Sequence, residues 1–162
     1  ALLGAFDTTL AAFVTMRQEE GAQLQEILTR HLTEIETAIA QAEDAIAARS
    51  DAQNTRLRAQ LARILENADG VDEGRIAQEL ALIAVKADVT EEIDRLRAHV
   101  AAARALLEDD GPIGRKLDFL MQEFNREANT LCSKSADAAL TQIGLTLKTV
   151  IDQMREQVQN VE

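Results

Sequence analysis

The sequence predicts an all-α protein, an elongated helical bundle with a long, coiled-coil-like helical arm. The 162-residue chain has one Pro, seven Gly and no Trp or Tyr, and 46% of its residues are apolar, mostly Ala, Leu, Ile and Val. These apolar residues recur at steps of three or four, and no stretch shows the alternation expected of a strand. This composition is typical of a helical protein with a thin aliphatic core.

Net charge and cysteine content limit the classes of partner and compartment. A net charge of -11 disfavours indiscriminate attraction to phosphate backbones, so any contact with nucleic acid must be local, and no DNA partner is expected. A lone Cys132 excludes an intrachain disulfide and suits a reducing cytoplasm, and the two histidines provide no zinc-finger spacing. No apolar run approaches the roughly 20 residues that cross a bilayer. We therefore expect a soluble, cytoplasmic protein without a membrane partner, and the opening ALLGAF is read as a boundary inside a longer protein.

Residues 1–70 predict an apolar segment followed by a long arm. The apolar residues of segment 1–15 fall at helical spacings, so this segment is expected to dock on another surface. From Leu24 to Ile46 the apolar residues recur at steps of three or four, as in a coiled coil. The pattern lapses at AARSDAQNTR, where Ser50 and Gln53 match a capping box. A break or bend near Ser50 is predicted, which would let the arm fold back.

Residues 71–162 are predicted to form a second, C-terminal helical domain. NADG ends the preceding helix, and a new one is predicted to begin near Val71 or Asp72. Asp88 can cap a further helix that ends near Glu108, because EDDGP follows. The last two helices are predicted over 112–133 and from about residue 135 onward.

The helix predicted over 112–133 carries more polar groups than solubility requires. On a wheel of about 100° per residue, its apolar arc comprises Leu117, Leu120, Met121, Phe124, Ala128 and Leu131. A polar stripe beside it comprises Asp118, Gln122, Asn125 and Asn129, with Arg115 and Arg126 at its edge. A third side holds Glu123 and Glu127 with Lys116 nearby.

Two interpretations of this wheel stay open. In the first, the polar stripe hydrogen-bonds a neighbouring helix, and the two glutamates form a solvated edge paired with Lys116. In the second, the amides and arginines contact phosphate or ribose, and the carboxylates hold a hard divalent cation, which prefers oxygen ligands.

The segment DVTEEIDRLRAHV, residues 88–100, provides a second group of candidates. Glu92 and His99 are seven residues apart, so they share one face of a helix. Capping and the helix dipole explain acids in a first turn without any function. A histidine at the rim of an apolar arc is more often a packing residue than a ligand or proton donor. No phosphate loop or other motif of high specificity is present.

Three stretches together resemble a known family: DVTEEIDRLRAHV, GRKLDFLMQEFNREANTLCSKSADA and EQVQNVE. Their order, spacing and composition are similar to the carboxy-terminal domain of the YicC family of bacterial proteins. The match is specific from about Val71 to Glu162 and looser over 1–70, where the helical pattern and VTMRQEEGAQL correspond. The resemblance implies a metal-dependent endoribonuclease, a hydrolase that cuts single-stranded or looped RNA in the cytoplasm. It also implies a ring-like homo-oligomer, expected to be a hexamer, and an amino-terminal region of mixed strand and helix without counterpart in these residues.

The resemblance further implies site residues and a divalent cofactor, Mg²⁺ or Mn²⁺. Metal binding is expected of Glu92, Glu123 and Glu127, and catalysis of these three together with His99. Contact with the RNA backbone is expected of Arg115, Arg126, Asn129 and Lys134. The matching positions without an assigned role are Glu91, Arg95, Lys116, Asp118, Gln122 and Asn125. Cys132 stands where the family usually has Gly or Ala, which concerns packing more than chemistry.

Two alternatives to this chemistry are retained. In a metal-free route, the ribose 2′-hydroxyl is the nucleophile and His99 the base. In the other, the chain is a helical oligomerisation or adaptor scaffold with no chemistry of its own, as the long arm would allow.

Overall fold

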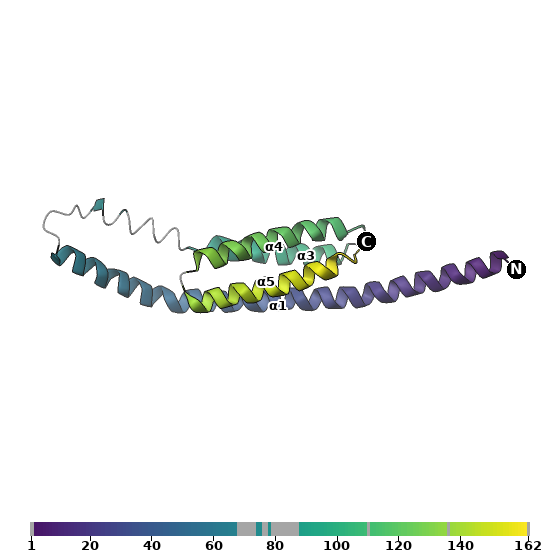
Figure 1. Ribbon diagram of the computed structural model, residues 1–162, viewed down its shortest axis with the longest axis horizontal. Helices are drawn as coiled ribbons and strands as arrows, with labels where there is room; N and C mark the ends of the chain where they lie inside the picture. Colours follow the sequence, from purple (N-terminus) through teal and green to yellow (C-terminus); the bar gives the residue numbers. More distant parts are fainter. Residues whose placement is uncertain are drawn as a thin grey trace.

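The computed structural model in Figure 1 describes four labelled helices. They are α1 (Leu2–Asn67), α3 (Thr90–Leu107), α4 (Gly114–Lys134) and α5 (Ala138–Val158). The described residues are 2–67, 74–75, 78, 88–109, 111–135 and 137–161, and within 49–67 side chains are described only at positions 55 and 59. The start of the helix predicted near residue 71 lies outside them.

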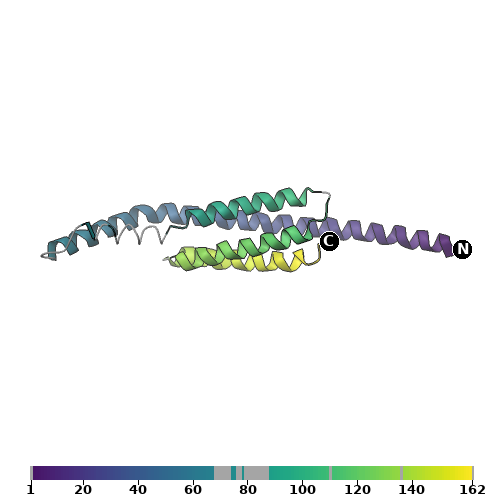
Figure 2. The same cartoon turned by 90° about the horizontal axis from the view of Figure 1, so that it is seen from above.

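Helices α3, α4 and α5 form a bundle along the middle of α1, as the two perpendicular views in Figures 1 and 2 show. Helix α4 packs against α3 and α5, and α1 packs against the same two helices from the other side. The predicted all-α, elongated bundle with a long helical arm is thereby confirmed. Among the described residues, no helix combines the length and apolarity needed to cross a bilayer.

The core of the bundle follows from apolar residues repeated every three or four positions, which place one stripe of each helix inward. It draws on both predicted domains, because the middle of α1 contributes to the same cluster as the C-terminal helices. Its largest fully buried apolar side chains include Leu28, Leu32, Ile35, Leu96, Leu117, Met121, Phe124, Leu131, Leu147, Ile151 and Met154. Ion pairs of Arg97 with Glu43 and of Arg104 with Glu36 flank the contact of α3 with α1.

Of the break or bend predicted near Ser50, the break does not occur, because α1 is one continuous helix from Leu2 to Asn67. Ser50 and Gln53 have the residue types of a capping box, but α1 continues through both positions. Neither residue stops a helix by itself, and the chain from 22 to 67 contains no Gly or Pro that would do so. The predicted fold-back of the arm falls outside the described residues.

The N-terminal segment of α1 extends past the bundle in both views (Figures 1 and 2). Its large apolar side chains are exposed, including Leu2 at 90%, Leu3 at 81% and Phe6 at 62%. This segment was predicted to dock on another surface. No described part of the chain covers it.

The C-terminal helices begin and end close to the predicted positions. Asp88 accepts a hydrogen bond from the Thr90 amide at 2.9 Å, which satisfies a donor at the start of α3. Hydrogen bonding with the side chain and then with the backbone of Thr90 lowers the pKa of the Asp88 carboxyl group. Asp137 is the N-cap residue of α5, and its side chain accepts a hydrogen bond from the Leu140 amide at 3.4 Å. Helix α4 starts at Gly114, two residues after Pro112.

Helices α4 and α5 pack closely where buried Gly144 faces Cys132. A Cβ atom at position 144 would lie 2.4 Å from Cys132 Sγ, well inside van der Waals contact. The cysteine is half-buried and therefore acts as a packing residue at this contact.

We expect Gly144→Ala to lower the free energy of unfolding by about 1 kcal/mol, because overpacking outweighs the better helix propensity of Ala. With Cys132→Ala in place, the same change should instead stabilise the protein by up to about 1 kcal/mol. Urea unfolding of the four proteins measures this coupling. An equal effect in both backgrounds would contradict the proposed contact.

Candidate functional site

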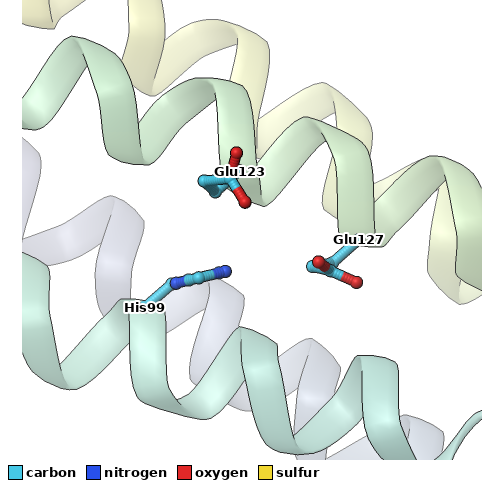
Figure 3. A group of neighbouring side chains, drawn as sticks. All are labelled: His99, Glu123 and Glu127. Atoms are coloured by element: carbon cyan, nitrogen blue, oxygen red, sulfur yellow. The ribbon is translucent and has the colours of Figure 1, made fainter.

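His99, Glu123 and Glu127 converge between α3 and α4. One potential ligand atom from each residue lies within 4.8 Å of the other two. Figure 3 shows the imidazole of His99 on α3 pointing toward the two carboxylates of α4. Glu127 is buried, at 2% exposure, whereas Glu123 and His99 are half-buried. The cluster therefore has one deep carboxylate and a side open to solvent.

The local sequence explains why these residues meet. Glu123 and Glu127 are four positions apart, so they lie one turn from each other on the same side of α4. Packing of α4 against α3 turns this side toward His99. The His99 ring contacts the edge of the Phe124 ring, with centroids 5.6 Å apart at 70°. Such a T-shaped arrangement is one of the favourable geometries for two rings.

Two arginines compensate the charge of buried Glu127. Arg95 Nη1 donates to Glu127 Oε1 at 3.3 Å, and Arg126 Nε lies 4.0 Å from the same oxygen. Arg126 Nη1 also donates to Glu123 Oε2 at 3.4 Å. The hydrogen bond to Glu127, together with the nearby Glu91 carboxylate, raises the pKa of Arg95. The shortest contact of each arginine to Glu127 is to Oε1.

The interpretation of both glutamates as a solvated edge paired with Lys116 is wrong. Glu127 is buried, and Lys116 Nζ instead binds Asp109 Oδ2 at 3.2 Å. On a single-helix wheel, Glu127 looks solvated because the wheel does not include α3.

The cluster has the donor set of a divalent metal site. His99 Nε2 is buried and has no hydrogen-bond partner among the described residues, and a buried ring nitrogen without a partner is costly unless a ligand satisfies it. One imidazole nitrogen and two carboxylates are suitable ligands for Mn²⁺ and for related divalent ions. Three protein ligands would leave coordination positions for water or substrate.

Comparison with known proteins identifies the family. The family described as "Endoribonuclease YicC-like, C-terminal" matches residues 42–162. The chain belongs to the YicC-like endoribonuclease family. "Probable endoribonuclease YicC" of Haemophilus influenzae is 43% identical over 161 residues, which are 99% of this chain and 55% of that protein. A protein of the same name from Clostridioides difficile is 35% identical over 158 residues, 98% of this chain and 54% of that protein. The chain thus spans about half the length of these relatives.

Of the four residues expected to be catalytic in this YicC-like chain, Glu92 lies outside the cluster. Glu92 is 4% exposed, and its Oε1 accepts a hydrogen bond from Lys134 Nζ at 2.8 Å. Lys134 also donates to the Asp88 carbonyl at 3.2 Å, and the hydrogen bond to Glu92 raises the pKa of Lys134. The expected metal ligand and the expected RNA-binding lysine therefore bind each other.

The other residues expected to contact RNA lie on two different surfaces. Arg126 and Asn129 line a groove between α4 and α5. Arg115 lines a mainly apolar groove between α3 and α4, beside Phe119 and Leu120. Arg95 matched the family motif without an assigned role, although its contact with Glu127 places it beside the cluster. The sequence could have indicated that Arg95 lies near the cluster, because it is four residues before His99 and therefore one turn away on the same helix.

Proposed function

We propose that this chain is the helical, C-terminal part of a metal-dependent endoribonuclease that cleaves single-stranded or looped RNA. The observation that carries the proposal is the convergence of His99, Glu123 and Glu127. The two relatives named probable endoribonucleases support RNA as the class of substrate. In this proposal His99, Glu123 and Glu127 hold the ion, and Glu92 is replaced as a ligand by His99.

The donor set favours Mn²⁺ over Mg²⁺ as the cofactor. An imidazole nitrogen is a softer ligand than oxygen, and Mg²⁺ prefers carboxylates, phosphates and water. When bound, the divalent ion would polarise the scissile phosphate and lower the pKa of a coordinated water.

Three side chains of the site, those of Glu123, Arg126 and Arg95, have different roles in the proposed cleavage reaction. Glu123, half-buried and 3.4 Å from Arg126, borders solvent and is placed to accept a proton from an attacking water. Arg126 faces the same edge, and its guanidinium would neutralise charge that develops on the phosphate. The exposed Arg95 orients Glu127, because its Nη1 lies 3.3 Å from Glu127 Oε1.

Chelation tests the proposal directly. A structured RNA incubated with the full chain should be cut in Mn²⁺, cut more slowly in Mg²⁺, and left intact in EDTA. Added Mn²⁺ should restore cleavage. Undiminished cutting in EDTA would defeat metal dependence, and a cyclic phosphate product under those conditions would favour the metal-free route through His99.

Replacing Arg95 with glutamine is expected to weaken Mn²⁺ binding and cleavage by roughly 10- to 100-fold, as is usual for residues that orient a metal ligand. The Arg95→Lys protein should recover part of the loss, because an ammonium can still neutralise Glu127. Mn²⁺ titration followed by electron paramagnetic resonance measures the affinity. Unchanged Mn²⁺ affinity in Arg95→Gln would remove Arg95 from the site.

A second candidate function, an oligomerisation or adaptor scaffold, is favoured by the exposed apolar N-terminal segment of α1. Contiguous apolar surface of this kind is usually covered by a partner. The proposed partner is another copy of the chain, in a ring-like homo-oligomer such as a hexamer. Mass measurement in solution, combined with the RNA cleavage assay, separates the two functions: an oligomer that cuts no RNA under any metal condition indicates a scaffold.

A further inference from the structure

An open groove of about 710 Å³ lies between α4 and α5. It contains one face of each helix, since its lining residues are spaced three or four apart. The α4 side is lined by Gln122, Asn125, Arg126, Asn129 and Thr130, and the α5 side by Lys148, Asp152 and Arg155. Most of the polar stripe of α4 therefore borders a groove that is open to solvent.

The groove is locally cationic on a chain whose net charge is -11. Arg126, Lys148 and Arg155 line it together with a single carboxylate, Asp152. Asp152 Oδ1 accepts a hydrogen bond from Asn125 Nδ2 at 3.3 Å. Among the described residues, neither Lys148 nor Arg155 forms an ion pair, although both are within one turn of Asp152 on α5. Two cations in the groove are thus left for a ligand.

The remaining lining groups suit a sugar-phosphate backbone. Gln122, Asn125 and Asn129 provide amides that can donate to phosphate oxygens and bind a ribose 2′-hydroxyl. No aromatic side chain lines the groove, so it offers no platform for base stacking. This combination favours recognition of the backbone over recognition of base sequence.

The groove adjoins the metal-binding cluster through Arg126. This residue lines the groove and also lies 3.4 Å from Glu123 and 4.0 Å from Glu127. A strand lying along the groove would therefore place a neighbouring phosphate beside the two carboxylates.

We propose that the α4–α5 groove binds the sugar-phosphate backbone of single-stranded RNA next to the scissile phosphate, with Lys148 and Arg155 as its principal phosphate contacts. The inference rests on the proposed endoribonuclease function, which it extends to residues of α5. A polyanionic strand is favoured over a protein partner, because the groove combines cations and amides and contains no large apolar side chain.

The test measures RNA binding by the full chain in EDTA, where no cleavage should occur. The probe is a fluorescent uridine homopolymer, and its affinity is measured at several salt concentrations. The Lys148→Gln, Arg155→Gln double variant should bind about tenfold more weakly at low salt. Each phosphate contact to a single strand contributes a slope of about -0.7 to the plot of log affinity against log salt concentration. The slope of the double variant should therefore be less steep by about 1.4. Arg155→Gln alone should give about half of that change.

The matched control is the double variant Arg30→Gln, Lys116→Gln. It removes the same charge from two exposed side chains that do not line the groove. This control should keep the affinity and salt slope of the parent, and circular dichroism should show all variants folded. Equal weakening by the control, an unchanged slope in the groove variant, or no RNA binding by the parent would each overturn the proposal.

Failure of the groove and failure of the enzyme give different results. If the parent and the groove variant both cut RNA with the same KM, the proposed groove function is wrong and the proposed nuclease function is supported. If the parent binds the probe through Lys148 and Arg155 but cuts no RNA in Mn²⁺, the proposed groove function is supported and the proposed nuclease function is wrong.

Discussion

Replacing Glu127 with glutamine is expected to slow RNA cleavage by roughly a thousandfold. The change keeps the shape of the side chain and a carbonyl oxygen that can still accept from Arg95, which now contacts Oε1 at 3.3 Å. It removes the buried negative charge on which both the proposed ion and the two arginines depend. Single-turnover cleavage in Mn²⁺ measures the rate, and Mn²⁺ titration should show weaker binding in parallel.

Glu156→Gln is the matched control for this experiment, because Glu156 is an exposed carboxylate on α5 outside the cluster. Its cleavage rate should equal that of the parent. Thermal unfolding should show that Glu127→Gln remains folded. A folded Glu127→Gln protein that cuts RNA at the parental rate would exclude this cluster as the catalytic site.

The fold could be predicted largely from the sequence, because helix boundaries and core stripes depend on local residue types. The spacing of Leu, Ile and Val fixes the buried face of each helix, and Asp88 and Pro112 mark two of the starts. The prediction of a break at Ser50 was wrong because it also used local residue types. A capping motif does not by itself end a helix when the residues on both sides can stay helical. The apolar start of α1 indicated a contact surface but not its partner.

The site was only partly predictable, because its pairings join different helices. The spacing of Glu123 and Glu127 indicated a possible ligand pair, yet no single-helix wheel could show that Glu127 faces His99 on α3. Glu92 and Lys134 are 42 positions apart in sequence, and the family resemblance selected both without revealing that they bind each other. Nothing in the sequence indicated that Lys148 and Arg155 could bind RNA. Their role is proposed only because α5 packs beside the polar stripe of α4.

The pair of Glu92 and Lys134 gives the second large expected effect, on stability. Replacing Lys134 with methionine should lower the Tm by roughly 5 to 10 °C. Glu92 is 4% exposed, and its Oε2 atom already has no hydrogen-bond partner among the described residues. Loss of the lysine would leave a buried carboxylate without compensation, which costs far more than loss of an exposed pair. Differential scanning calorimetry measures the shift.

A second substitution shows whether Glu92 has a structural role or binds the proposed ion. Replacing both partners with methionine removes the buried charge together with its counterion, so the double variant should regain most of the lost Tm. If the pair is structural, this double variant should also cut RNA in Mn²⁺ at close to the parental rate. If Glu92 is instead a metal ligand, the double variant would be stable but inactive, because methionine provides no oxygen to a hard cation. A stable, active double variant would assign the ion to His99, Glu123 and Glu127, because among the described residues these side chains form the one group of three potential ligands.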